Sequence, residues 1–191
     1  EVRVRLHASG VNPSDVKKRA GLRSPLQEKQ VIPHSDGAGI IDQVGARVDP
    51  ARQGERVWVY NGQWGRPFGT AADYITLPAT QAISLPDPVS FAEGACLGIP
   101  AMTAHRCLFA DGSIRGQTVL VTGGAGAVGY YAIQLAKWGG ARVITTVSSE
   151  AKAETARQAG ADFTLNYRTE NIVERIQAVT EGLGVARIVE V

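Results

Sequence analysis

The stretch TVLVTGGAGAVG, residues 118–129, decides the fold of the second half of this 191-residue chain. It begins as an apolar run typical of a buried parallel strand and leads directly into apolar residues at helical spacing, which predict a helix over residues 127–138. Gly124, Gly126 and Gly129 have the GxGxxG spacing of a dinucleotide-binding turn. In such a turn the first glycine permits a tight turn, the second lets the backbone approach a pyrophosphate, and the third lets helix and strand pack closely. A glycine-rich turn without a ligand is the alternative.

The end of the next expected strand, residues 142–147, indicates which dinucleotide binds. NAD sites usually place an acidic residue there, which holds the ribose hydroxyls and would repel a 2′-phosphate. This chain has Val147, Ser148 and Ser149 at that point. Lys152 follows at the start of the next expected helix. Two hydroxyls and one ammonium suit a phosphate better than a bare ribose, so the sequence favours NADPH.

Two alternatives stay open at this position. Ser148 or Ser149 has the residue type of an ordinary helix N-cap, and Lys152 then is a solvated surface lysine. Glu150 lies close enough in the sequence to serve as a displaced ribose ligand, which would allow NADH.

Composition and charge exclude several classes of function. The chain is 44% apolar and 20% charged, with a net charge of +2, and has no basic run interleaved with aromatic residues, so we expect no nucleic-acid partner. No apolar stretch is long enough for a membrane span, and we expect a cytoplasmic enzyme.

The cysteines and histidines do not predict a metal site. Cys96 and Cys107 lie in apolar surroundings without CxxC spacing, which favours buried, reduced thiols. The three histidines, His7, His34 and His105, are scattered along the chain. We therefore expect no bound metal.

The two halves of the chain have different textures. Short strands between Pro and Gly turns predict a mainly β, barrel-like domain in the first half, and the capping box Ser90–Glu93 predicts a helix start. These strands are expected near residues 2–7, 37–44, 57–60 and 72–77. The second half alternates strands and helices, the rhythm of a right-handed parallel α/β sheet. Its strands are expected near 118–122, 142–147, 163–166 and 186–191, and its helices near 127–138, 149–159 and 169–180.

Several motifs in one order give the chain a family resemblance. They are Gly10–Asp15 (GVNPSD), Ile32–Gly39 (IPHSDGAG), Gly54–Val57 (GERV), Gly98–Ala104 (GIPAMTA) and the glycine turn. The chain resembles the zinc-independent medium-chain dehydrogenases/reductases, in particular quinone oxidoreductases of the zeta-crystallin type. The resemblance implies a GroES-like β-barrel domain over residues 1–100, followed over residues 101–191 by an incomplete Rossmann domain that contains only its N-terminal half. It further implies a homodimer with its active site between the two domains.

The resemblance also implies roles for individual residues. The pyrophosphate-binding turn matches Gly124, Ala125, Gly126, Ala127, Val128 and Gly129. Ser148 and Lys152 match positions at the adenosine 2′-phosphate, and Tyr167 matches a tyrosine that packs near it. Ser149 is a further cofactor-binding candidate because its hydroxyl lies beside Ser148. Asn12 and Thr103 match catalytic-site residues near the nicotinamide. Without the resemblance, Asn12 is a turn former before Pro13 and Tyr167 an ordinary residue after a strand.

Departures from related families sharpen the functional hypothesis. Zinc-dependent alcohol dehydrogenases have a Cys near the position of Asn12, a His at that of Ser35, and a four-Cys lobe, none of which occurs here. Lys17 replaces a Tyr found after the Asn-Pro motif in many quinone reductases. A quinone accepts hydride readily, whereas a simple ketone needs a Lewis acid or strong proton donor.

The sequence therefore predicts an NADPH-dependent, metal-independent quinone reductase that acts on quinones or other conjugated carbonyls. Asn12 would orient the nicotinamide or polarise the acceptor oxygen, and Asp15 would brace this loop. Two alternatives remain. One is an enoyl or alkenal double-bond reductase, and the other is a non-catalytic NADPH-binding sensor.

Overall fold

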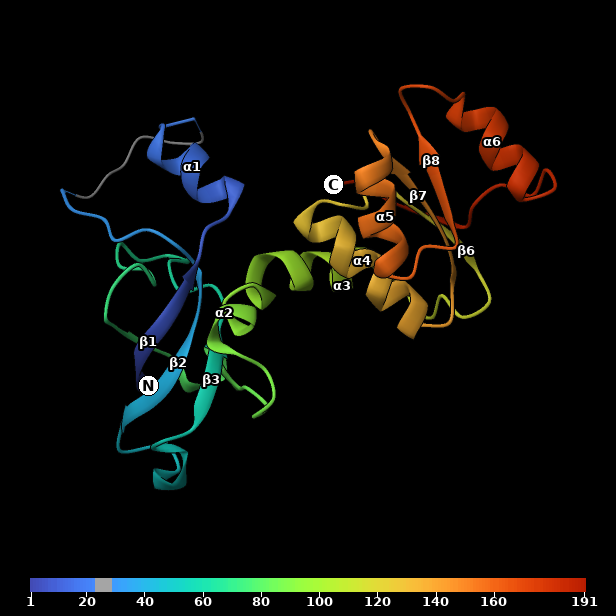
Figure 1. Ribbon diagram of the computed structural model, residues 1–191. Coiled ribbons are helices and arrows are strands. Elements are labelled where there is room, and N and C mark those ends of the chain that lie inside the picture. Colours follow the sequence, from blue (N-terminus) through green and yellow to red (C-terminus); the bar gives the residue numbers. More distant parts are fainter. Residues whose placement is uncertain (23–28) are drawn as a thin grey trace. The chain divides into compact units, whose positions relative to one another are not determined.

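The computed structural model of this protein describes residues 1–22 and 29–191. These residues form two compact units, Glu1–Ile99 and Pro100–Val191, each built on a sheet of its own (Figure 1). The first sheet is antiparallel and the second is parallel.

The first unit is a five-stranded antiparallel sheet in the order β4-β1-β2-β3-β5. Its strands are β1 (Val2–Gly10), β2 (Asp36–Val44), β3 (Arg56–Val59), β4 (Tyr74–Leu77) and β5 (Ala82–Ser84). The period-2 pattern of β1 buries Val2 and Val4, which join Ile41, Val57 and Leu77 in the main core of this unit. Four strands lie where the sequence predicts them. The sequence did not predict β5, because three residues are too few to show an alternation, and β5 forms by pairing with β3.

Short helices complete the first unit. They are α1 (Pro13–Arg19), α2 (Phe91–Gly94) and two 3₁₀ turns, Pro50–Arg52 and Ala79–Gln81. The predicted capping box is confirmed, since Ser90 Oγ accepts from Glu93 N at 3.2 Å and Glu93 Oε2 accepts from Ser90 N at 2.8 Å. The helix it starts is only one turn long. A turn of π-helix, Leu97–Ala101, follows, and the boundary between the two units falls within it.

The second unit alternates helices and parallel strands, as the sequence predicts. Its helices are α3 (Met102–Phe109), α4 (Ala127–Trp138), α5 (Glu150–Gln158) and α6 (Ile172–Val179), and its strands are β6 (Thr118–Val121), β7 (Arg142–Val147), β8 (Phe163–Asn166) and β9 (Arg187–Val189). The sequence analysis did not predict α3. The strand order β8-β7-β6-β9 is the 3-2-1-4 order of the first part of a Rossmann sheet.

Apolar side chains cover both faces of the parallel sheet. One face carries the larger core, where α3, α4 and α5 pack through residues such as Leu108, Ile133 and Ala156. The opposite face packs on α6 through Ile144 and Leu165 (Figure 1). Because both faces are buried, the strands have continuous apolar runs.

The prediction of two buried thiols is wrong for Cys96, which is exposed, while Cys107 is half-buried. The reason is the short length of α2. The chain turns after Gly94, and Ala95 takes the buried position beside Leu85 and Ala38 while Cys96 faces solvent. Both cysteines are free thiols.

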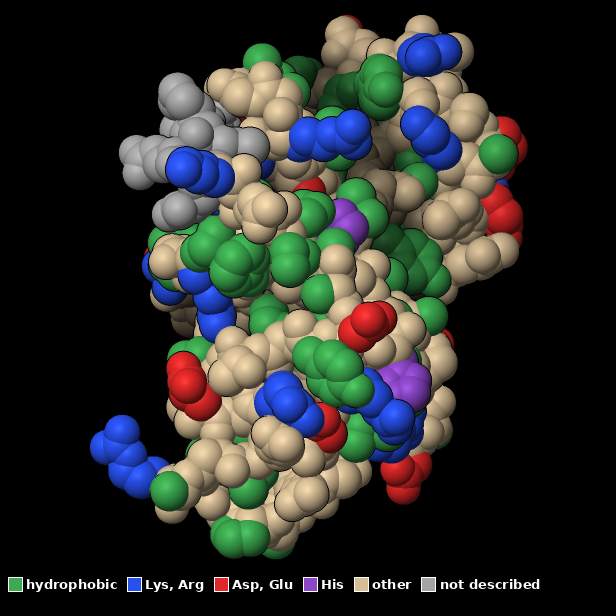
Figure 2. All heavy atoms as spheres, turned by 90° about the vertical axis from the view of Figure 1, so that its left-hand side faces the viewer, with side chains coloured by type: hydrophobic (Ala, Val, Ile, Leu, Met, Phe, Trp, Pro, Cys, Tyr) green, Lys and Arg blue, Asp and Glu red, His purple; other side chains and the backbone are tan. Residues whose placement is uncertain are grey.

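The surface of the described residues shows no segregation by charge on the face seen in Figure 2. There, basic, acidic and apolar side chains lie interspersed. In the part of the chain that the structure describes, every helix is too short or too polar to cross a membrane.

Replacing Ile133 by Ala tests the core of the second unit. Ile133 is fully buried on α4, so the substitution should lower the free energy of unfolding by about 2–5 kcal/mol through lost burial and a residual cavity. Denaturant unfolding measures the change. The neighbouring exposed Gln134→Ala is the matched control and should change stability by less than about 0.5 kcal/mol. Equal effects of the two substitutions would contradict the described packing.

Candidate functional site

The glycine turn joins β6 to α4 and is tied to the end of β7. Gly123 N donates to Thr146 Oγ1 at 3.2 Å, and Gly124 N donates to the Thr146 carbonyl at 3.1 Å. Gly126 N donates back to the Gly123 carbonyl at 2.8 Å and closes the turn. These bonds fix the turn at the carboxyl edge of the parallel sheet, where ligands of open α/β sheets bind.

The glycines of the turn differ in backbone conformation and in the space around them. The left-handed residue of the turn is Gly123, with φ of 61°, one residue before the glycine that the spacing singles out. Gly124 is required for space, since a Cβ there would overlap Thr145 Oγ1. Gly129 lets α4 pack closely, as predicted, because a Cβ there would overlap the Gly123 carbonyl.

Gly126 is exposed at the start of α4. Its backbone has φ of −78° and ψ of 164°, which any residue can adopt. A Cβ at this position would meet only the Gly123 carbonyl, at 3.2 Å. Among the described residues, no side chain caps the N-terminus of α4. Its N–H groups and positive dipole end therefore remain available to an anion, with the exposed Ala127 beside them and Ala125 and Val128 half-buried.

The residues after β7 form the start of α5. Ser149 is the N-cap and its Oγ accepts from Lys152 N at 3.4 Å, so the capping alternative holds for Ser149. Ser148 is half-buried and Lys152 is exposed. Glu150 forms an ion pair with Arg157. Glu150 is the carboxylate that the sequence suggests as an alternative ribose ligand.

Tyr167 lies next to this strand end. Its N–H donates to the Val147 carbonyl at 3.1 Å, and its side chain is 53% exposed. Because β6, β7 and β8 are parallel neighbours, their carboxyl ends meet at one edge. The structure therefore brings the glycine turn, Ser148 and Tyr167 to the same edge of the sheet.

Asn12, the predicted residue of the first unit, is the N-cap of α1 and is 5% exposed. Its N–H donates to Asp15 Oδ2 at 2.8 Å, so Asp15 braces this loop as expected. Its Nδ2 donates to Asp36 Oδ2 at 2.8 Å. Both the backbone and the side chain of Asn12 are thus held by carboxylates.

Asp36 is the centre of this network and is almost fully buried. Burial raises the pKa of Asp36, and repulsion from Asp15 adds to the rise, while hydrogen bonds from Ile99 N and Asn12 oppose it. The Thr70 hydroxyl donates to the Asp36 carbonyl at 2.6 Å. The main chain and the side chain of Asp36 are therefore both fixed.

Thr103 lies in the other unit, exposed in the first turn of α3. Asn12 belongs to the first unit and Thr103 to the second. Lys17 is exposed on α1.

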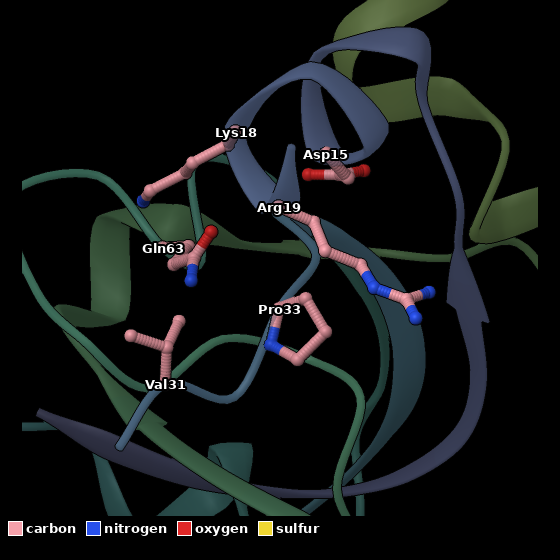
Figure 3. A pocket seen from close by; sticks show the side chains of 6 residues that line it. All are labelled: Asp15, Lys18, Arg19, Val31, Pro33 and Gln63. Atoms are coloured by element: carbon pink, nitrogen blue, oxygen red, sulfur yellow. The ribbon is translucent and has the colours of Figure 1, made fainter. Parts of the chain in front are cut away.

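A cavity of about 350 Å³ lies beside α1 in the first unit (Figure 3). It is lined by Asp15, Lys18, Arg19, Val31, Pro33 and Gln63. In Figure 3 the charged ends of Lys18 and Arg19 point to opposite sides, so they do not converge on one anion. Gln63 is 5% exposed, and its Nε2 donates to the Ile32 carbonyl at 2.9 Å.

Residues 1–22 and 29–191 contain no group of three or more His, Cys, Asp or Glu side chains placed to hold a metal ion. Ser35, the position at which the resemblance predicts the absence of a His ligand, accepts at its carbonyl from Gly62 N at 2.7 Å.

Comparisons with known proteins agree with this architecture. Residues 1–87 match the alcohol dehydrogenase GroES-like domain family, and residues 127–191 match the zinc-binding dehydrogenase family. A quinone oxidoreductase of Rattus norvegicus is 36% identical over 193 residues, covering 100% of this chain and 57% of that protein.

The chain belongs to the quinone oxidoreductase family of the medium-chain dehydrogenases/reductases.

Two solved structures of this superfamily resemble the chain. Escherichia coli quinone oxidoreductase in complex with NADPH is 32% identical with a TM-score of 0.81, over 95% of this chain and 54% of that one. An NAD-dependent alcohol dehydrogenase is 32% identical with a TM-score of 0.87, over 98% of this chain and 61% of that one. The predicted fold class, a GroES-like domain followed by part of a Rossmann domain, is confirmed. The chain spans a little over half the length of these relatives.

Sequence reasoning missed three structural features in and around these candidate sites. Thr145 and Thr146 shape the glycine turn through their hydroxyls, which a strand-like sequence pattern does not reveal. Gln63 belongs to a glycine-rich loop and carries no motif. The role of Asp36 could have been predicted, because an acidic residue at the start of the otherwise apolar strand segment Asp36–Ile41 needs a hydrogen-bond partner.

Substituting Gly126 by Ala separates ligand approach from folding in this reductase-family turn. The dihedral angles of Gly126 accept Ala, and the added methyl stands 3.2 Å from the Gly123 carbonyl, which must shift slightly to accommodate it. The melting temperature should therefore fall only modestly, while the methyl obstructs the approach of a pyrophosphate. We expect NADPH affinity to fall at least roughly tenfold, about 1.4 kcal/mol. Fluorescence titration measures this. Gly129→Ala is the contrasting variant and should lower stability, and unchanged NADPH affinity in Gly126→Ala would refute the assignment of this turn.

The raised pKa of Asp36 predicts a pH-dependent stability. The folded state binds the proton of this carboxyl more tightly than the unfolded chain does. The stabilisation that comes from protonating Asp36 in the folded state is therefore fully present below the unfolded-state pKa of about 3.9. It is lost as the pH rises through the raised folded-state pKa of Asp36. The stability of the wild type relative to Asp36→Asn should fall over this window. Urea unfolding from pH 4 to 8 measures the difference, and a difference that grows with pH would show that the pKa is lowered.

Proposed function

We propose that this chain is part of an NADPH-dependent oxidoreductase that transfers hydride to quinones or other conjugated carbonyls without a catalytic metal. The observation that carries the proposal is the end of β7. Val147 is buried there, Ser148 and Lys152 follow it, and the nearby Glu150 is paired with Arg157. Positions 147–149 contain no carboxylate, and a strand end of this kind favours the 2′-phosphate of NADPH over the bare ribose of NADH.

The glycine turn fits a dinucleotide pyrophosphate. Gly126 is exposed and carries no side chain that would stand in the way of a pyrophosphate, and the N-terminus of α4 offers uncapped N–H groups among the described residues. Ala125, Gly126, Ala127 and Val128 are the backbone positions that would hold the pyrophosphate, while Gly124 and Gly129 make room for the turn.

The 2′-phosphate would meet side chains from two strand ends. Ser148 and Lys152 follow β7, and Tyr167 follows β8 with its ring half exposed. Ser149 supports this group indirectly, because its hydroxyl caps α5 and fixes the turn that carries Lys152. The E. coli relative in complex with NADPH supports this choice of cofactor.

NADPH, when bound, supplies the hydride. The residues of the chain orient the reactants, and Asn12 and Thr103 are the candidates beside the nicotinamide. Asn12 is suited to orientation rather than proton transfer, because its side chain is neutral and held by Asp36. A quinone needs little further activation, and water or a hydroxyl provides its proton.

Lys17 gives one reason to keep a second acceptor class. Many quinone reductases have a Tyr at this position, whereas Lys17 is an exposed cation on α1. Enones, alkenals and enoyl thioesters are therefore tested beside quinones.

The compartment we propose is the cytoplasm. Cys96 and Cys107 are free thiols, and a reducing compartment keeps an exposed thiol such as Cys96 reduced.

Turnover by the protein that carries this chain, with and without prior chelator treatment, tests the proposal. NADPH and NADH oxidation are compared with an ortho-quinone, an enoyl thioester and a simple ketone. We expect NADPH-selective quinone reduction that survives chelation. Thioester turnover would identify a double-bond reductase, and ketone turnover lost on chelation would overturn the metal-free mechanism. Cofactor binding without turnover would indicate a sensor.

A further inference from the structure

One buried side-chain polar atom lacks a hydrogen-bond partner in the described part of the chain, and it is Asp36 Oδ1. Asp36 is 1% exposed. A buried carboxyl oxygen without a partner carries an uncompensated desolvation cost, so its retention calls for an explanation. The explanation lies in what the other oxygen does.

Asp36 Oδ2 accepts two hydrogen bonds from segments that are far apart in the sequence. Asn12 Nδ2 donates from the start of α1, and Ile99 N donates from the π-helical turn that ends the first unit, each at 2.8 Å. One oxygen at the start of β2 therefore holds two segments together.

The unpartnered oxygen keeps the carboxyl group in place. Asp36 Oδ1 packs against Gly98, where a Cβ would overlap it. A carboxyl group with Gly98 against one oxygen and two donors on the other has little room to rotate about χ2. Asp36 Oδ1 therefore lacks a hydrogen bond in the same orientation of the carboxyl group that lets Oδ2 accept two.

We propose that Asp36 is a positioning residue that fixes the carboxamide of Asn12, an inference that rests on the proposed role of Asn12 beside the nicotinamide. Asp15 holds the Asn12 backbone N–H, and Asp36 holds the side chain, so the two carboxyls constrain different rotations. With Nδ2 directed at Asp36, the carbonyl oxygen of Asn12 faces the Asp15 backbone N–H in the capping box of α1, and its second lone pair is left as an acceptor. This suits an amide N–H donor such as the carboxamide of nicotinamide.

Kinetics in the protein that carries this chain test the inference. Asp36→Ala removes the acceptor and should lower kcat for quinone reduction by about tenfold to a hundredfold, because the Asn12 amide loses its orientation. Asp36→Asn retains an oxygen that accepts both N–H groups and should restore kcat to within about threefold of the wild type. Asp42→Asn is the matched control on the same strand, where Asp42 pairs with Arg3 on the surface, and should leave kcat unchanged.

Gly98→Ala is an independent variant that alters neither Asn12 nor Asp36. Its methyl displaces the carboxyl group, so it should reproduce the loss in kcat seen with Asp36→Ala. It carries the kinetic test if Asp36→Ala does not fold. A Gly98→Ala protein that folds and retains full kcat would overturn the inference.

The side-chain amide signals of Asn12, observed by NMR, give a readout that needs no turnover. In the wild type and in Asp36→Asn, one amide proton should be shifted downfield and protected from exchange. In Gly98→Ala the signals should collapse toward those of a free carboxamide. Unchanged Asn12 signals would overturn positioning by Asp36. A normal kcat in Asn12→Ala, together with the expected NMR shifts, would instead contradict only the proposed role of Asn12.

Discussion

The parallel pairing of β6 with its neighbours is the constraint on which the candidate cofactor site depends. β6 lies between β7 and β9 in register, and β8 extends the sheet beyond β7. Parallel strands place all their carboxyl ends at one edge, so residues separated by more than 40 positions become neighbours. The glycine turn after β6, Ser148 after β7 and Tyr167 after β8 meet there for this reason alone. The hydrogen bonds from Gly123 and Gly124 to Thr146 then lock the turn to the edge.

In the first unit, hydrogen bonds fix the orientation of one polar side chain, Asn12, beside the antiparallel sheet. Asn12 lies at the start of a short helix that has few packing contacts of its own to orient it. Two buried carboxyls replace those contacts, with Asp15 on the backbone and Asp36 on the side chain. The free-energy cost of burying an ionised carboxyl group falls mainly on Asp36, whose pKa is raised by burial. Buried polar groups of this kind fix one geometry at a cost in stability.

Local patterns in the sequence predicted the regular elements well. The helix over 127–138 and the strands over 142–147 and 163–166 have the bounds expected, because apolar periodicity and glycine punctuation are local signals. The pattern failed where tertiary contacts decide, as in β5, in the left-handed position of Gly123, and at the exposed Cys96. The hydroxyl contacts of Thr145 and Thr146 depend on which strands are neighbours, which no single segment encodes. The binding roles of Ser148, Lys152, Tyr167, Asn12 and Thr103 remain predictions.

The affinity of the protein for NADPH compared with NADH, measured by calorimetry at one fixed salt concentration, tests the central claim most directly. A strand end that presents Ser148, Lys152 and Tyr167 without a free carboxylate should bind NADPH at least about tenfold more tightly, a difference of about 1.4 kcal/mol. Truncating Lys152 to Ala should remove most of that preference while leaving NADH affinity unchanged. Equal affinities, or a preference for NADH, would contradict the account.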